Sequence, residues 1–582
     1  MNENDNLSNK RHTLAHLLAQ AVLEHYPASQ LTLGPAVDNG FYYDVDFNEE
    51  KISYSDLEKL QKSMRKNLNK WTEFTHKEVS REEAIEVFKG NVYKEELINE
   101  IAKRGEEITL YTCGGFTDLC RGGHSENPAK EIMSDSFKLD RVAGAYWRGS
   151  KKNKMLTRIY GLAFETKKKL DEYIYRQEEA KKRDHRKLGR ELDLFTFSDL
   201  VGAGMPLFTP KGNIVREEII KFSRELNNEL GFGEVHTPNI NKAELFKKSG
   251  HYDKYKEDML TVSSQYVSDE MFLKPMNCPQ HTQIYASQPR SYRDLPIRYS
   301  DFAVLYRDER PGEMSGLTRL RAFSQDDGHI FCREDQIEEE VSKVLHSIKK
   351  ALSVYNIGYW IRLSLRDTNN KEKYLGDDET WEKSENQLRN ILEKNNVEYK
   401  AVEGEAAFYG PKLDIMAVDA LGREWQISTI QVDRNIPTRF EIEYIDSDGL
   451  KKTPVMIHRA LIGSPDRFMG ILIEHYAGEF PLWLSPVQIK VIPVRDTHNA
   501  YAKEISDILK EQNIRVELDA RDLNLGKRVR EAKNEKVPYM IIIGDKEVES
   551  QKLTVEGRTE KIEDITKEEF LKKIQEEIIN KK

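Results

Sequence analysis

The spacing of hydrophobic residues changes several times along the chain. Residues 12–25 carry apolar side chains at helical spacing, with His12 and His16 on one face of the expected helix. Residues 31–47 read as strands around Gly-Pro and Asn-Gly turns. Residues 165–190 are highly charged and predict a long connecting helix. The chain should therefore begin with an α+β domain that ends in a helical connection.

The remaining sequence contains two further patterns. Residues 212–240 predict an amphipathic helix, a glycine stop and a strand that Pro238 closes. Strand-like segments then dominate, namely "DEMFLK", "FAVLYRD", "LTRLRAFSQDDGHIF", "AAFYGPKLDIMAV" and "EWQISTIQVD". After "LWLSPV" strands and helices alternate, as in a βαβαβ unit. We expect a large antiparallel sheet with flanking helices, followed by a small α/β domain.

These patterns predict a multidomain fold of α+β and α/β type. A length of 582 residues suggests about three to four domains. We expect an N-terminal α+β domain at 1–163, a linker helix at 164–190, an antiparallel-sheet domain at 191–484 and a C-terminal α/β domain at 485–582.

Composition excludes several functional classes. No apolar run approaches the ~18 residues of a membrane span and no signal peptide is evident, so we expect a cytoplasmic protein without membrane contact. The net charge of −9 means that nucleic acid would have to bind through local patches. In a reducing compartment the four cysteines argue against a disulfide framework and leave metal binding, catalysis or packing; they are Cys113, Cys120, Cys278 and Cys332.

The densest group of chemically active residues is "YRDERPGEMSGLTRLRAFSQDDGH", residues 306–329. Arg307 and Glu309 precede a Gly/Pro turn, and alternation along a returning strand would put positions 319, 321, 323, 325 and 327 on one face. Such a face suits a nucleotide, with Arg307 on the α-phosphate, Glu309 on a base edge and Phe323 as a stacking surface. Arg467, at the start of a later helix, would bind the terminal phosphate. A surface hairpin with ordinary salt bridges is the alternative.

Five further motifs occur in the order "KPMNCP", "QDDGHIFC", "FYGPKLDI", "WQISTIQVD" and "IHRALIGS". Together with the segment ending at Pro238, "LYRDER…RLRAF" and "GSPDRFMGIL", they make the chain similar to threonyl-tRNA synthetases, a family of class II aminoacyl-tRNA synthetases. The resemblance implies an editing domain at 1–163, a class II catalytic domain at 191–484 and an anticodon-binding domain at 485–582. It also implies a ligase that activates threonine with ATP and transfers it to tRNA(Thr).

The resemblance further implies one zinc ion per chain, held by Cys278, His329 and His458. Three protein ligands leave a tetrahedral zinc with one open position. Threonine and valine are nearly isosteric, so an apolar pocket separates them by only about a hundredfold, whereas a zinc that binds the hydroxyl needs an oxygen that valine lacks. His281 is expected to be a packed or surface histidine. Threonine would contact Met276, Gln325, Asp327, Tyr409 and Gln431.

The same resemblance assigns the other residues of the reaction. Arg307, Arg319 and Arg467, together with Mg²⁺ and Lys412, would act in adenylate formation. His251 would assist transfer to the terminal ribose of the tRNA. ATP would be bound by Arg307, Glu309, Arg319, Phe323, Gln426 and Arg467.

A second, hydrolytic site is expected because serine keeps the hydroxyl and differs from threonine by one methyl group, worth only ~1 to 3 kcal/mol. The segments "HTLAH" and "CRGGH" supply His12, His16, Cys120 and His124. Taken alone, a histidine pair at this spacing is about as often structural. The segments resemble the editing domain of the family, where Lys94 and Asp118 also match, which implies hydrolysis of seryl-tRNA(Thr). The four residues could hold zinc, but we expect no required metal there.

The expected partners are tRNA(Thr), ATP, L-threonine and a second copy of the chain in a homodimer. The resemblance implies anticodon contacts at Arg521, Lys536 and Glu547. The small ubiquitin-like domain usual in the family is not expected, because the editing motif begins at residue 12. Two alternatives are disfavoured: an RNA-binding protein without activity has no need of this set of arginines and zinc ligands, and a synthetase for proline or serine would not combine that zinc set with the editing motifs.

Overall fold

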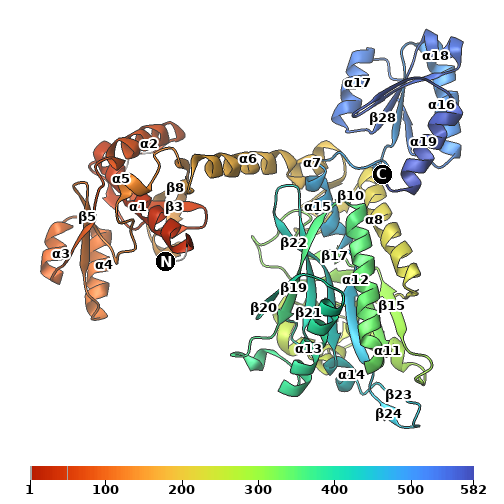
Figure 1. The fold of residues 1–582 in the computed structure, drawn as a ribbon, viewed down its shortest axis with the longest axis horizontal. Helices are drawn as coiled ribbons and strands as arrows, with labels where there is room; N and C mark the ends of the chain where they lie inside the picture. Colours follow the sequence, from red (N-terminus) through yellow and green to blue (C-terminus); the bar gives the residue numbers. More distant parts are fainter. Residues whose placement is uncertain (1–2, 49, 51) are drawn as a thin grey trace. The chain divides into compact units, whose positions relative to one another are not determined.

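The computed structural model describes residues 3–48, 50 and 52–582. The chain divides into two compact units, residues 1–178 and 179–582, and each is described by itself (Figure 1). Within the described residues, no helix combines the length and the apolar character needed to cross a membrane.

The first unit is built on a five-stranded sheet covered by two helices, α1 (Glu3–His25) and α2 (Tyr54–Leu68). Its strands are β1 (Gln30–Leu31), β2 (Ala36–Val37), β3 (Gly40–Asp46), β7 (Phe137–Tyr146) and β8 (Met155–Ala163). Phe41, Tyr43 and Val45 alternate into the core from β3, as a half-buried strand requires. A Cβ atom at Gly161, opposite Phe41, would lie 2.3 Å from its ring, so glycine allows this close approach.

A smaller antiparallel sheet completes this unit. It consists of β4 (Thr75–Glu78), β5 (Thr109–Cys113) and β6 (Phe116–Leu119), with α3 (Arg81–Val87), α4 (Val92–Lys103) and the short α5 (Pro128–Glu131) in the same unit. Figure 1 shows α3 and α4 beside β5. The loop after β6 brings "CRGGH" to the side of α1, because the amide of Ser125 donates to the Thr13 hydroxyl at 3.0 Å.

The connecting helix predicted at 165–190 is two helices, α6 (Lys167–Arg183) and α7 (His185–Glu191). Asp184 separates them, and its carboxylate accepts the backbone amide of Arg186 as the N-cap of α7. Aspartate favours the N-cap because its side chain satisfies an amide that the new helix leaves without a partner.

The second unit contains an eight-stranded sheet in the order β11-β15-β18-β25-β22-β21-β19-β20, antiparallel except for its two outermost pairs. The strands are β11 (Gly233–Glu234), β15 (Ile297–Asp301), β18 (Asp327–Cys332), β25 (Val455–Ala460), β22 (Glu424–Asp433), β21 (Lys412–Val418), β19 (Gly358–Leu365) and β20 (Tyr399–Glu403). The helices α8 (Pro210–Glu229), α12 (Ile337–Val354), α13 (Asp378–Lys394) and α15 (Pro465–His475) share its core. The predicted antiparallel sheet is confirmed.

Alternation along the central strands separates a core face from an open face. Ile330, Leu413, Ile430 and Ile457 are buried in the core that α12 also joins. Their neighbours on the same strands point the other way and line a cavity; these are His329, Lys412, Gln431 and His458. The sheet thus presents a row of polar side chains to a single site.

Two segments predicted as strands of this sheet lie outside it. The strand β14 (Met271–Leu273) pairs with β12 (Ile240–Lys242) and β13 (Thr261–Val262), and β16 (Val304–Tyr306) pairs only with β17 (Ala322–Ser324). The prediction of one continuous strand face over 319–327 is wrong. The chain leaves the strand after Ser324 because the Asp326 carboxylate turns inward to accept Ser223, Arg459 and the amides of Leu461 and Ile462.

The C-terminal sheet has the order β27-β26-β28-β29-β30. The predicted βαβαβ unit is confirmed by β26 (Ile489–Pro493), α16 (Asn499–Glu511), β27 (Val516–Leu518), α17 (Leu525–Asn534) and β28 (Tyr539–Ile543). The short helix α18 (Asp545–Ser550), an antiparallel pair and a last helix follow: β29 (Leu553–Gly557), β30 (Lys561–Ile565) and α19 (Lys567–Ile579).

Candidate functional site

Three residues far apart in sequence meet on the open face of the eight-stranded sheet. Cys278 begins α11 (Cys278–Ala286), His329 lies on β18, and His458 lies directly opposite His329 on β25. All three are buried, and their candidate ligand atoms lie within 4.8 Å of one another. His329 Nε2 and His458 Nδ1 are 3.0 Å apart. The predicted zinc ligands are therefore brought together.

The hydrogen bonds of the two histidines define which nitrogens face each other. His458 Nε2 bonds the Asp433 carboxylate at 2.8 Å, so this nitrogen carries the proton and Nδ1 is a lone-pair donor. His329 Nδ1 bonds His281 Nδ1 at 2.7 Å, and a proton on His329 Nδ1 leaves its Nε2 as a second lone-pair donor. Two ligands of a tetrahedral zinc lie about 3.3 Å apart. The donor set therefore fits a zinc ion, since a cation would offset the repulsion between the two lone pairs.

A cavity of about 570 Å³ opens beside these three residues. Burial raises the pKa of the Asp327 carboxyl to about 6, and the Tyr409 hydroxyl donates to Gln431 at 2.6 Å. His251, the first residue of α10 (His251–Tyr255), is buried with its Nε2 3.6 Å from Cys278 Sγ, and burial lowers its pKa to about 3. The cavity is lined by predicted residues of the reaction: Met276, Gln325, Asp327, Tyr409, Gln431, His251 and Lys412.

An adjoining cavity of about 480 Å³ shares six lining residues with the first, namely Arg307, Glu309, Arg319, Gln325, Thr429 and Gln431. The Arg307 guanidinium lies 5.1 Å from the centre of the Phe323 ring. Burial, and next the nearby Arg307, lower the pKa of Arg467, whose buried Nε has no hydrogen-bond partner among the described residues. Among the described residues neither Arg307 nor Arg467 forms an ion pair, and two unpaired guanidinium groups favour an anionic ligand. The predicted nucleotide residues all line this cavity, namely Arg307, Glu309, Arg319, Phe323, Gln426 and Arg467.

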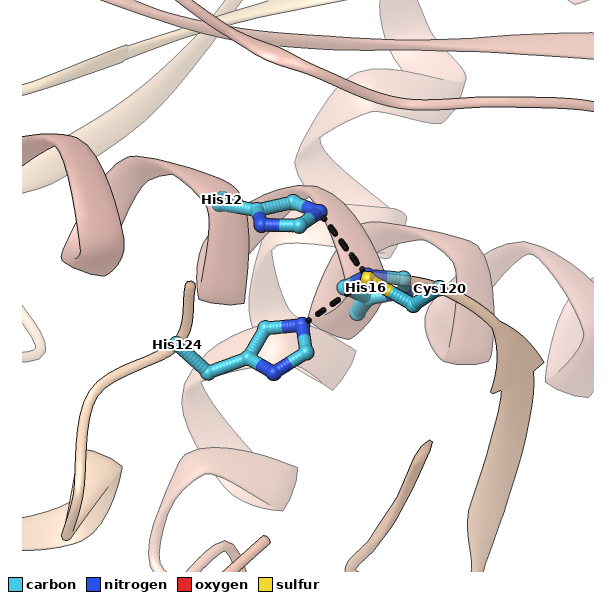
Figure 2. A group of neighbouring side chains, drawn as sticks. All are labelled: His12, His16, Cys120 and His124. Atoms are coloured by element: carbon cyan, nitrogen blue, oxygen red, sulfur yellow. Dashed lines mark hydrogen bonds between the residues drawn. The ribbon is translucent and has the colours of Figure 1, made fainter. Parts of the chain in front are cut away.

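The first unit contains a separate cluster (Figure 2). His12 and His16 project from α1 toward Cys120, and His124 lies on the loop that follows. Cys120 Sγ lies 3.5 Å from His12 Nε2 and 3.4 Å from His124 Nε2. Burial alone would raise the pKa of Cys120, but hydrogen bonds from His12, His124 and His16 outweigh it and lower the pKa to about 3. The cluster thus favours a thiolate surrounded by imidazoles.

A buried charge network supports this cluster. Asp118 lies 2.5 Å from the Lys94 ammonium and 3.1 Å from His16 Nδ1, and it accepts the Tyr43 hydroxyl at 2.6 Å. Burial opposes ionisation of Asp118, but Lys94 and His16 hold its pKa well below the ordinary value. A cavity of about 350 Å³ is lined by five of the six predicted editing residues, His12, His16, Lys94, Asp118 and Cys120. The sixth, His124, does not line this cavity, and its Nε2 lies 3.4 Å from Cys120 Sγ.

The three predicted anticodon residues do not converge on a shared cavity among the described residues. Arg521 is half exposed and pairs with Asp519 and Glu531. Lys536 pairs with Glu479 at 2.8 Å. Glu547 is nearly buried, where it caps the amide of Gly544 and accepts the Thr554 hydroxyl. Arg521 and Lys536 are partly exposed, whereas Glu547 is buried with both of its carboxylate oxygens bonded.

Sequence reasoning missed the residues that orient the metal ligands. His281 was expected to be packed or on the surface, and it is fully buried, but it also bonds His329. Asp433 ends the "WQISTIQVD" motif and bonds His458. The only available signal was position, since His281 follows Cys278 by one helical turn and Asp433 continues the alternation of Thr429 and Gln431.

Comparison with known proteins is consistent with this geometry. Residues 260–476 match the family described as the class II tRNA synthetase core domain (G, H, P, S and T). Residues 488–577 match the anticodon binding domain, and residues 108–160 match the second additional domain of threonyl and alanyl tRNA synthetases.

Whole-chain relatives extend this result. A threonine–tRNA ligase of Thermotoga maritima is 47% identical over 98% of this chain and 88% of its own length. One of Rubrobacter xylanophilus is 48% identical over 94% and 85%. A solved structure of the RNA binding domain of threonyl-tRNA synthetase from Cryptosporidium parvum is 37% identical, with a TM-score of 0.64, over 68% of this chain and 98% of its own. On this fold, these sites and this similarity, the chain belongs to the threonine–tRNA ligase family of class II aminoacyl-tRNA synthetases.

Proposed function

We propose that the chain activates threonine with ATP, transfers it to tRNA(Thr), and hydrolyses seryl-tRNA(Thr) in its first unit. The observation that carries the proposal is the pair of adjoining cavities on the second unit. One holds a Cys-His-His set beside Asp327 and Tyr409, and the other holds Arg307 and Arg467, two guanidinium groups that form no ion pair among the described residues. An amino acid and a nucleotide triphosphate would thus be held side by side.

Threonine would bind in the first cavity. Cys278, His329 and His458 would hold one zinc ion, which when bound would supply a Lewis acid for the amino and hydroxyl groups of the substrate. Asp327 would accept a hydrogen bond from the hydroxyl. Gln325, Tyr409 and Gln431 would orient the amino group, and Met276 would line the methyl side. Valine would leave these polar groups unpaired, and a site built to bond a hydroxyl rejects such an analogue strongly.

ATP would bind in the second cavity with Mg²⁺. Phe323 would support the base, with Glu309 and Gln426 at its polar edges. Arg307 would contact the α-phosphate, while Arg467 and Arg319 would neutralise the departing pyrophosphate. Arg319 is held by Glu309 and Glu313 at 2.8 and 2.7 Å, so ATP would exchange one of these partners. Lys412, paired with Asp414 at 2.9 Å, would stabilise charge where the two substrates meet.

Transfer to tRNA needs a base near the terminal ribose. His251 borders the amino-acid cavity, and its burial keeps the imidazole neutral at physiological pH. A neutral imidazole can accept the ribose hydroxyl proton as that oxygen attacks the adenylate carbonyl, the mixed-anhydride C–O bond breaks and AMP leaves. The anticodon would be read by the C-terminal domain, with Arg521, Lys536 and Glu547 as proposed contacts. We propose a homodimer formed through the segment that ends at Pro238.

Serine passes the first site because it lacks only a methyl group. We propose that seryl-tRNA(Thr) is hydrolysed at the cluster of His12, His16, Cys120 and His124. Lys94 and Asp118 would hold a water molecule and the charge of the tetrahedral intermediate. The threonine methyl group would prevent the ester from reaching this water.

The test separates the two sites. Arg467→Ala should abolish charging of tRNA(Thr) but leave hydrolysis of preformed seryl-tRNA(Thr) intact. Cys120→Ala should do the reverse, so that serine accumulates on the tRNA. Threonyl-tRNA(Thr) is the control ester. Equal hydrolysis of both esters by the intact chain, or unimpaired release of serine by Cys120→Ala protein, would contradict the editing role.

A further inference from the structure

His185, the first residue of α7, lies between the two elements that form one wall of the proposed ATP cavity. Its side chain is 4% exposed. On one side lies Leu317, in the loop between β16 and β17, and on the other lies Glu474, in the last turn of α15. The loop contributes Leu317, Thr318 and Arg319 to the cavity, and α15 contributes Arg467 and Phe468.

The protonation of His185 follows from its partners. The backbone amide of Leu317 donates to Nε2 at 3.0 Å, so Nε2 is an acceptor. Nδ1 must then carry the proton, which it donates to the Glu474 carboxylate at 2.6 Å. The backbone amide of His185 also donates to Glu474, at 3.0 Å. A neutral imidazole with both nitrogens bonded is the result. Asp184, His185 and Glu474 lie close enough to be considered as metal ligands. Both nitrogens of His185 already have hydrogen-bond partners, so these three residues do not favour a metal ion.

The loop between β16 and β17 packs directly against the His185 ring. Gly316 has φ +50°, and a Cβ atom there would lie 2.1 Å from His185 Nε2. A Cβ atom on Gly470 of α15 would lie 3.1 Å from the Leu317 side chain and 3.6 Å from the His185 ring. The two glycines allow the loop, the ring and the helix to approach closely, so a shift of the ring would displace the loop.

Besides His185, the loop is anchored by the backbone amide of Asp308, which donates to the Asp258 carbonyl at 2.9 Å, and by the fully buried Leu317 side chain. Its remaining described backbone bonds to other parts of the unit include those from Arg321 and Ala322 to the Gly204 carbonyl, at 2.9 and 3.3 Å. The bonds of Arg319 to Glu309 and Glu313 are within the loop itself and partly exposed. His185 therefore supplies a buried bond to the loop two residues from Arg319.

We propose that His185 is a positioning residue for ATP: its Nε2 fixes the loop that carries Arg319, and Glu474 fixes the tautomer that makes Nε2 an acceptor. The inference rests on the proposed function, because it assigns the adjoining cavity to ATP. It predicts a larger effect on ATP than on threonine, since Leu317 and Thr318 line the second cavity and not the first, although Arg319 borders both.

Two amide variants test the roles of His185 Nδ1 and Nε2 separately. In His185→Asn the amide occupies the place of Nδ1 and keeps the bond to Glu474, but the Leu317 amide is left unpaired. In His185→Gln the carbonyl oxygen reaches the place of Nε2 and keeps the bond to Leu317. In threonine-dependent ATP–pyrophosphate exchange, His185→Asn should raise the KM for ATP about tenfold and the KM for threonine by less than about twofold. His185→Gln should stay within about threefold of the wild type for ATP.

A second readout does not depend on activity. Hydrogen exchange of peptides covering 310–320 should be faster in His185→Asn than in the wild type and in His185→Gln. Lys187→Ala, an exposed neighbour on α7, is the matched control and should change neither measurement. Should His185→Asn not fold, Glu474→Gln tests the same arrangement and should raise the KM for ATP alone by about threefold.

Equal behaviour of the Asn and Gln variants would overturn the inference. Hydrogen exchange of residues 310–320 that is the same in His185→Asn and the wild type would also overturn it. An equal rise in the KM values for ATP and threonine, together with a lower Tm, would indicate a structural role only and would overturn it as well. If the wild type and Lys187→Ala both lacked threonine-dependent ATP–pyrophosphate exchange, the proposed function would fail instead. The hydrogen-exchange comparison would still decide whether His185 holds the loop.

Discussion

Asp433→Asn should weaken zinc binding although it changes none of the three proposed ligands. Asp433 Oδ1 accepts the backbone amides of Asn435 and Ile436 at 2.7 and 2.9 Å, and Oδ2 accepts His458 Nε2–H at 2.8 Å. Asparagine can keep the two backbone bonds only by turning its NH₂ group toward His458. The imidazole would then accept at Nε2 and carry its proton on Nδ1, which is the atom that faces His329 Nε2.

The size of the effect follows from two losses. The wrong tautomer must be reversed before Nδ1 can bind a metal, and a fully buried negative charge next to the site is removed. Residues that orient metal ligands typically contribute about 10- to 100-fold in metal affinity. At about 1.4 kcal/mol per tenfold change, the expected loss is about 1.4 to 2.8 kcal/mol.

The assay is competition for zinc between the purified chain and a chromophoric chelator at fixed pH. Glu424→Gln is the matched control, because Glu424 starts the same strand and bonds Trp360 rather than a ligand. A zinc Kd for Asp433→Asn within about twofold of the wild type, or an equal loss in Glu424→Gln, would refute the tautomer argument.

Three further experiments have defined outcomes. Cys120 should be alkylated by iodoacetamide at about pH 6 nearly as fast as at about pH 8, because its lowered pKa keeps the thiolate where an ordinary thiol with a pKa of 9.0 is protonated; a steep fall in rate below pH 8 would contradict this. Asp326→Ala should destabilise the second unit by about 3 to 5 kcal/mol in urea unfolding, since it leaves the fully buried Arg459 unpaired. Asp326→Leu with Arg459→Met should recover much of that loss, and wild-type stability of the single variant would be inconsistent with a buried charge pair. Arg307→Ala should lower adenylate formation by at least about 100-fold without changing the circular dichroism spectrum, and normal activity would remove the proposed phosphate contact.

The C-terminal domain and the central sheet could be predicted from sequence because their patterns are local. Strand and helix periods alternate over 489–543, and β21 and β22 place most of their core residues on one face and most of their polar residues on the other. The metal set could not be obtained in this way. His329 and His458 are 129 residues apart and meet only through strand register, so their pairing came from the resemblance.

The end of the strand at Ser324 could not be predicted from hydrophobic periodicity either, because it also depends on contacts with distant segments. The carboxylate of Asp326 is turned inward by donors on α8, on β25 and in the turn that follows β25. The same holds for His281, whose contact with His329 depends on how α11 packs on the sheet. Interactions that join distant segments leave no periodic signal in the sequence.

ATP–pyrophosphate exchange measured with each of the standard amino acids tests the central claim most directly, since it reports which amino acid the Cys278, His329 and His458 site selects. The account predicts that threonine gives the highest kcat/KM, that serine is activated measurably because it keeps the hydroxyl, and that valine stays at least about ten-thousandfold below threonine. Exchange with valine or proline comparable to that with threonine would contradict the account.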